Sequence, residues 1–120
     1  MPTRLIRKFD FHAAHFLPGF PEGHACRTVH GHTYQCEIVL EGDTDPDTGM
    51  LVEFDEVKRA LAPVEATLDH AMLNELEGLA NPTTEVLAKW VYDRIKPALP
   101  MLACVRLFET PRNGVEYDGG

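Results

Sequence analysis

Hydrophobic and polar residues alternate along residues 30–41, HGHTYQCEIVLE, which is the pattern of a β-strand with one buried face. Residues 5–15, LIRKFDFHAAH, alternate in the same way, and residues 17–24 between them are rich in turn-forming Pro and Gly. We therefore expect two paired antiparallel strands. The side chains that share the apolar faces are Leu5, Phe9, Phe11 and His15 in one strand, and His30, His32, Tyr34, Cys36, Ile38 and Leu40 in the other.

The period changes from two to about 3.6 after residue 53. Apolar residues recur three and four positions apart from Phe54 to Leu68, which predicts an amphipathic helix. Asp55 is its predicted N-cap, and Pro63 is expected to kink or shorten it. The residues that form this apolar face are Phe54, Val57, Leu61, Val64 and Leu68.

A second helix is predicted to begin within residues 81–85, NPTTE, and to stop at Pro97. Short alternating segments predict further strands, at residues 50–54, 102–109 and 114–117. Strands, two helices and then strands again indicate an α+β fold in which the helices cover one face of an antiparallel sheet. The uncovered face and any free strand edge would favour oligomerisation.

The composition is that of an ordinary globular protein, with 44% hydrophobic and 25% charged residues. A formal net charge of −8 argues against a nucleic-acid surface, which depends on clustered Lys and Arg. No apolar stretch approaches the roughly 20 residues of a membrane span, and no signal-peptide pattern is present. The three cysteines form no CxxC pair and fit a reducing compartment. We expect a single domain over residues 1–120, in a cytoplasmic protein that binds neither nucleic acid nor membranes.

Three histidines could bind one metal ion. His30 and His32 project from the same strand face, and His15 projects from the apolar face of the neighbouring strand. Neutral imidazoles suit zinc, and three protein ligands would leave the fourth coordination position open, as in catalytic sites. On the residues alone, this interpretation stands beside the plainer one in which each histidine is part of the core.

Cys26 has two possible roles beside these histidines. As a fourth ligand it would close the zinc site and make it structural. It also lies in a polar loop next to Arg27, where a basic neighbour would favour the thiolate that a base or nucleophile needs. Two other features gain weight only in this company: the adjacent pair Asp69 and His70, and Glu109 at the end of a predicted strand.

Five segments taken in order resemble the 6-pyruvoyltetrahydropterin synthase family: FHAAH, PEGHACRTVHGH, LDHAMLN, NPTTEVLAKW and the final ET. The resemblance runs over nearly the whole chain, from about Phe9 to Thr110, and five motifs in register are far more specific than any one. The bacterial 6-carboxytetrahydropterin synthase branch is the most similar, because three residues separate Cys26 from His30 and none of them is a glutamate.

The resemblance implies a role for each of nine residues: zinc binding by His15, His30 and His32; catalysis by Cys26, Asp69 and His70; substrate binding by Glu109, Thr84 and Arg27. The implied substrate is 7,8-dihydroneopterin triphosphate. The implied reaction forms 6-carboxy-5,6,7,8-tetrahydropterin in the 7-deazapurine and queuosine pathway, with release of triphosphate and acetaldehyde. Cys26 would then be a base and not a fourth ligand.

The implied fold is the tunnelling fold, an antiparallel four-stranded sheet with two helices on one face. Sheets of neighbouring subunits would join into a barrel, in a homohexamer built as a dimer of trimers. The active sites would then lie between subunits, so that catalytic residues could come from different chains.

Three alternatives stay open at this point. A 6-pyruvoyltetrahydropterin synthase, which eliminates triphosphate, or an aldolase-type enzyme would use nearly the same residues. His30-Gly-His32 followed by Glu37 and Gly42 partly matches a cupin metal motif, but a cupin would be all-β. A zinc-stabilised oligomer without enzymatic activity would use Cys26 as the fourth ligand.

Overall fold

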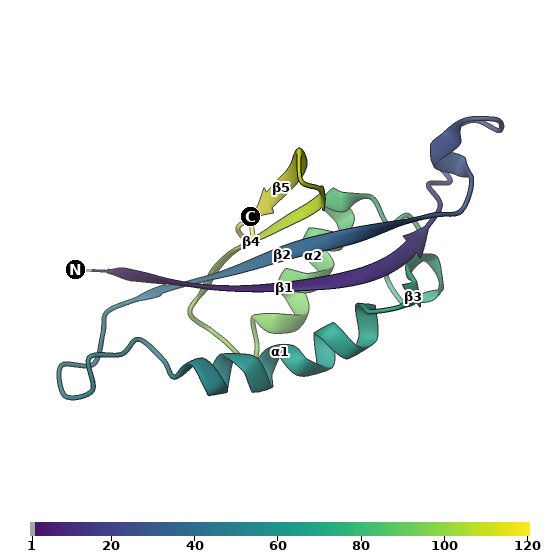
Figure 1. Cartoon of the computed structure of the whole chain (residues 1–120). Coiled ribbons are helices and arrows are strands. Elements are labelled where there is room, and N and C mark those ends of the chain that lie inside the picture. Colours follow the sequence, from purple (N-terminus) through teal and green to yellow (C-terminus); the bar gives the residue numbers. More distant parts are fainter. Residues whose placement is uncertain (1) are drawn as a thin grey trace.

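A sheet with two helices on one of its faces makes up the structure, a computed structural model that describes residues 2–120 (Figure 1). The described residues contain five strands in the spatial order β3-β1-β2-β4-β5. The elements along the chain are β1 (Thr3–His15), the 3₁₀ turn η1 (Ala25–Arg27), β2 (His30–Gly42), α1 (Phe54–Leu68), β3 (Ala71–Met72), the 3₁₀ turn η2 (Leu73–Glu75), α2 (Thr84–Ile95), β4 (Leu102–Thr110) and β5 (Asn113–Tyr117). The predicted α+β class is therefore confirmed, and the all-β cupin alternative is wrong.

The long hairpin of β1 and β2 is the centre of the sheet. The two strands pair antiparallel without interruption, from Thr3 opposite Gly42 to His15 opposite His30. The alternation in the sequence is realised as predicted, because Phe11 and Tyr34 are fully buried and stack with ring centroids 4.8 Å apart. The same parity leads directly to the three histidines at the end of the hairpin.

The two helices pack on the face of the sheet that carries these aromatic residues. Helix α1 begins after Glu53, not after the predicted N-cap Asp55, which lies within the first turn. The helix also continues through Pro63 to Leu68 and is not shortened there. Pro63 is exposed, so the carbonyl that loses its helical hydrogen bond can be hydrated. Helix α2 begins after Thr83, whose hydroxyl accepts a hydrogen bond from Val86 N at 3.1 Å.

The strand count differs from the expectation of four in an instructive way. Residues 50–54 do not form the predicted strand, because Met50 closes a turn in which its carbonyl accepts a hydrogen bond from Asp45 N at 2.8 Å. The additional strand is instead β3, which pairs parallel to β1 through Ala13 opposite Ala71. Two residues are too few to give an alternating sequence pattern, so this strand could not be predicted.

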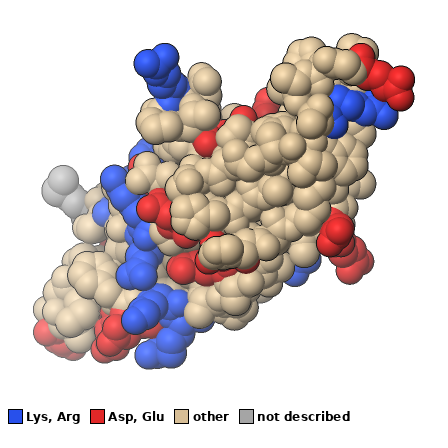
Figure 2. Space-filling view, turned by 45° about the vertical axis from the view of Figure 1, so that its right-hand side comes forward, with Lys and Arg blue, Asp and Glu red and all other residues tan. Residues whose placement is uncertain are grey.

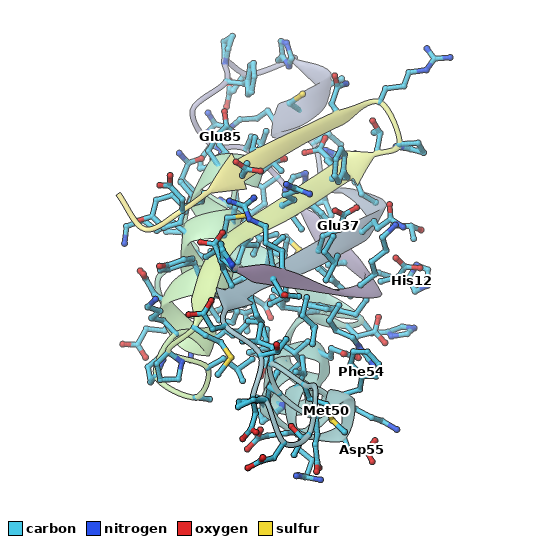
Figure 3. All side chains as sticks on the ribbon, turned by 90° about the vertical axis from the view of Figure 1, so that its left-hand side faces the viewer. His12, Glu37, Met50, Phe54, Asp55 and Glu85 are labelled. Atoms are coloured by element: carbon cyan, nitrogen blue, oxygen red, sulfur yellow. The ribbon has the colours of Figure 1, made fainter. Side chains whose placement is uncertain are left out.

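The face of the sheet away from the helices carries a row of charges. Glu37 lies between Lys8 and Arg106, with N···O distances of 3.8 and 3.5 Å, and Arg106 also pairs with Glu116 at 2.7 Å. In Figure 3 the labelled His12 and Glu37 project from this side. Figure 2 shows acidic and basic side chains interspersed on the face it displays. These pairs neutralise one another and offer no extended basic surface for phosphates.

Both outer edges of the sheet are open over most of their length. Beyond its two pairs with β3, strand β1 has no partner on that side among residues 2–120, and β5 likewise has only β4. Ile6 on β1 and Phe54 at the start of α1 are 52% and 72% exposed, so apolar surface accompanies the open β1 edge. Unpaired edges of this kind favour pairing with a second chain. Within the described residues, no helix has the length and apolarity needed to cross a membrane.

Candidate active site

The three predicted metal ligands converge at the end of the β1–β2 hairpin. His15 and His30 are directly opposite in the strand register, and His32 is two residues further along β2 on the same face. One ring nitrogen from each of the three side chains lies within 4.8 Å of the other two. His15 is fully buried, while His30 and His32 are partly buried. The alternation of the strands thus brings three imidazoles to one point.

Hydrogen bonds to backbone carbonyls set the tautomers of two of these rings. His15 Nδ1 lies 3.0 Å from the Pro82 carbonyl, and His30 Nδ1 lies 2.6 Å from the Thr28 carbonyl. A carbonyl only accepts hydrogen bonds, so each Nδ1 carries the proton and each Nε2 presents a lone pair. The two Nε2 atoms are only 3.0 Å apart. Two lone pairs facing each other at this distance repel unless a cation lies between them.

The third imidazole fits the same interpretation. His32 Nε2 is buried and has no hydrogen-bond partner among the described residues, although Glu109 Oε1 lies 3.1 Å away in poor hydrogen-bonding geometry. A buried nitrogen without a partner is costly and is expected to bind something. Burial lowers the pKa of both His15 and His32, which keeps the rings in the neutral form that binds metal.

These observations fit a zinc ion held by three histidines. Two nitrogens bound tetrahedrally to one zinc at about 2.0 to 2.1 Å are about 3.3 Å apart, close to the separation of His15 and His30. Cys26 is not a member of the convergent group. A three-ligand site with one open position is therefore favoured over a closed site with a fourth protein ligand.

Glu109 lies at the end of β4 beside the histidines. Its Oε2 accepts a hydrogen bond of 2.8 Å from the hydroxyl of Thr84, the first residue of α2. The two side chains border a hollow of about 200 Å³, lined by Thr84, Glu85, Glu109, Asn113, Gly114 and Val115. Two residues that the sequence assigned to substrate binding are thus in contact with each other and next to the proposed metal ligands.

The Asp69–His70 pair is also assembled as predicted. Asp69 Oδ2 lies 3.0 Å from His70 Nδ1, and Asp69 Oδ1 accepts a hydrogen bond of 2.9 Å from His12 N. This backbone hydrogen bond is the main reason why the pKa of Asp69 lies below its ordinary value. His70 has a left-handed backbone, φ 61°, and donates its N–H to the His12 carbonyl. A non-glycine residue in that region is uncommon and here orients an imidazole toward solvent.

The three histidines and the Asp69–His70 pair lie on opposite faces of the hairpin. The His70 ring lies 5.9 Å from the ring of His12, which belongs to the helix-free parity of β1 and contacts Thr33 on β2. His15, of the other parity, instead contacts the carbonyl that precedes α2. A surface hollow of about 430 Å³ is lined in part by His12, Thr33 and His70. One chain therefore does not bring His70 to its own three-histidine group.

Cys26 and Arg27 lie in residues 16–29, here called the cysteine loop, which projects beyond the end of the sheet (Figure 1). Cys26 is partly exposed, and its thiol makes no hydrogen bond within residues 2–120. Arg27 Nη1 donates to the carbonyls of Pro18 and Phe20 at 3.0 and 2.9 Å. The prediction that Arg27 binds substrate stays a prediction, because one of its nitrogens is used within the loop.

The sequence did not reveal the groups that orient the site. The carbonyls of Thr28 and Pro82, which fix two imidazoles, carry no side-chain signal. Asn74 was also missed: its amide donates to the Phe16 carbonyl at 2.8 Å and its Oδ1 accepts from Phe16 N at 3.0 Å. This paired contact holds the chain where it leaves β1 after His15. Its one available signal was an asparagine within a segment that has no regular periodicity.

The model of the family described as 6-pyruvoyl tetrahydropterin synthase matches residues 4–120 of this chain. The chain belongs to that family. It is 40% identical to the 6-carboxy-5,6,7,8-tetrahydropterin synthase of Bacillus subtilis, over 90% of this chain and 81% of that protein. It is 34% identical to the dihydroneopterin monophosphate aldolase of Pyrococcus furiosus, over 98% and 99% of the two chains.

The fold agrees with this family membership. The solved structure of Caenorhabditis elegans 6-pyruvoyl tetrahydropterin synthase superimposes with a TM-score of 0.93 at 26% identity, covering 100% of this chain and 97% of that one. The family resemblance seen in the five sequence motifs is therefore confirmed.

Proposed function

We propose that this protein is a zinc-dependent lyase that converts 7,8-dihydroneopterin triphosphate to 6-carboxy-5,6,7,8-tetrahydropterin, with release of triphosphate and acetaldehyde. The observation that carries the proposal is the convergence of three neutral imidazoles beside Glu109, in a chain of this family. The carboxy-forming product is favoured by the 40% identity to the Bacillus subtilis protein. The step would belong to 7-deazapurine and queuosine biosynthesis.

His15, His30 and His32 would hold the zinc ion, which when bound supplies a Lewis acid that makes C–H groups beside substrate oxygens more acidic. Cys26, as a thiolate, would then take a proton from the substrate side chain. His70 would carry a proton on the other side of the carbon chain, because Asp69 holds its Nδ1 at 3.0 Å and leaves Nε2 free. Such proton transfers suffice for the tautomerisation that precedes loss of triphosphate.

Glu109 is proposed to orient the pterin ring. A pterin presents an amino group and a ring N–H side by side, and a carboxylate can accept both. Thr84 donates to one carboxylate oxygen at 2.8 Å and so restricts its rotation. Each oxygen retains a lone pair for the ligand, and the neighbouring hollow of about 200 Å³ provides space beside Thr84 and Glu109.

A complete site would require more than one copy of the chain. His70 and the three histidines lie on opposite faces of one hairpin, and the sheet has two open edges. We therefore propose a homo-oligomer, a hexamer formed by two trimeric barrels, in which His70 acts at the metal site of a neighbouring copy. An inactive zinc-stabilised oligomer would have this assembly but no turnover.

Mass spectrometry of the products formed from 7,8-dihydroneopterin triphosphate tests the proposal directly. We expect 6-carboxytetrahydropterin, acetaldehyde and triphosphate in equal amounts, and activity that depends on bound zinc. Formation of 6-pyruvoyltetrahydropterin with triphosphate would support the second candidate, a 6-pyruvoyl tetrahydropterin synthase, which the name of the matching family favours. No conversion by zinc-loaded protein would refute both.

A further inference from the structure

The cysteine loop has no hydrophobic core of its own. None of residues 16–29 is buried, and the regular structure in the loop is the three-residue turn η1. Figure 1 shows the segment extending away from the sheet. Its conformation, and with it the position of Cys26, must therefore depend on hydrogen bonds made within the loop itself.

Both backbone groups of Cys26 are engaged in such bonds. The Cys26 carbonyl accepts a hydrogen bond from Leu17 N at 2.8 Å, and the Cys26 N–H donates to His24 Nδ1 at 3.1 Å. The ring of Phe20 stacks on that of His24 with centroids 4.2 Å apart. The first part of the loop, residues 17–20, thus lies against the turn that carries the thiol.

Arg27 links the same two parts of the loop through its side chain. Its Nη1 donates to the carbonyls of Pro18 and Phe20, at 3.0 and 2.9 Å, on the segment that also contacts Cys26. Its guanidinium forms no ion pair with any carboxylate of the described residues. The side chain therefore satisfies two carbonyls that would otherwise have only water, and closes the loop around the turn.

We propose that Arg27 is a positioning residue, which holds Cys26 in place by joining η1 to residues 17–20. The inference rests on the proposed catalytic role of Cys26 and deepens it. It assigns the Arg27 contact to the loop and not to the triphosphate of the substrate. Arginine suits this task because its planar group presents several donors in fixed directions, which the single ammonium of lysine does not.

The test compares Arg27→Ala and Arg27→Lys with the control Arg59→Ala, which removes an exposed arginine on α1. Steady-state kinetics give kcat and KM, and inhibition by inorganic triphosphate reports phosphate affinity. Hydrogen exchange of the peptide covering residues 17–28 reports the order of the loop. Zinc content and exchange in β1 and β2 report the remainder of the fold.

We expect kcat to fall roughly 100-fold in both Arg27 variants, the effect typical of a reacting group displaced by about 1 Å. Loop exchange should become faster in both variants, while KM, inhibition by triphosphate and zinc content stay as in Arg59→Ala. Lysine keeps the charge and should not restore the rate. These results together would separate positioning from a charge contact with the substrate.

Three outcomes would overturn the inference. Normal kcat in Arg27→Lys, with weaker inhibition by triphosphate in Arg27→Ala, would show that the charge binds substrate. Normal kcat and normal loop exchange in Arg27→Ala would show that the contact is dispensable. Zinc loss in both variants would show that the effect is not confined to the loop. An inactive Cys26→Ala beside a fully active Arg27→Ala overturns only this inference, whereas an active Cys26→Ala refutes the catalytic role of Cys26.

Discussion

Replacing Glu109 by glutamine tests the orientation of the pterin ring. In the structure, Glu109 Oε2 accepts the Thr84 hydroxyl at 2.8 Å, so one oxygen is already fixed and the other faces the histidines. Glutamine has one acceptor oxygen and one NH₂ group. Whichever way the amide turns, either the Thr84 hydroxyl or one pterin N–H meets a donor instead of an acceptor.

The expected loss follows from one unpaired, largely desolvated donor, which costs about 1 to 3 kcal/mol, or roughly a fivefold to 150-fold loss of affinity. Zinc content should not change, because the three imidazoles and the carbonyls that orient them are untouched. Glu85→Gln is a matched control: Glu85 lines the same hollow of about 200 Å³ but is exposed, so the same chemical change should leave binding unaltered.

Titration calorimetry with a pterin that lacks the phosphorylated side chain measures this affinity without turnover. The pterin should bind more weakly to Glu109→Gln than to wild type and Glu85→Gln, which should be alike. Thr84→Val should lie between these extremes, because it frees the carboxylate to rotate but keeps both acceptors. Equal affinity in wild type and Glu109→Gln would show that this carboxylate does not orient the ring.

Three further predictions concern the metal and the proton carriers. His30→Ala should lose zinc as measured by atomic absorption while Cys26→Ala keeps it, and the reverse result would make Cys26 a ligand. Cys26→Ala and His70→Ala should each fold and bind zinc but turn over about 100- to 10,000-fold more slowly, and mixed oligomers of the two inactive chains should regain activity if their residues meet between subunits. Metal-free protein should lose stability in thermal melts as the pH falls below 6.5, because burial lowers the pKa of His15 and His32 and the unfolded chain then binds more protons. The same melts should be insensitive to these two groups above that pH, so a constant melting temperature from pH 7.5 to 5 would contradict this argument.

The sequence by itself determined which side chains share a face. Strict alternation along β1 and β2 put His15, His30 and His32 on the apolar side with Phe11 and Tyr34, because the period of a strand leaves a residue only two faces. The helical spacing after Phe54 predicted α1 for the same reason. Local periodicity of this kind is a property of the backbone and needs no knowledge of distant residues.

Only the tertiary structure decided where the non-periodic segments lie. The parallel pairing of β3 with β1 places His70 beside His12, on the face opposite the metal ligands, and no pattern in two residues could indicate that. The Pro82 carbonyl reaches His15 because α2 packs on the sheet, across 67 positions of sequence. Such contacts depend on the free energy of packing the whole core, which favours one arrangement of long-range partners, and a single segment of sequence does not contain that information.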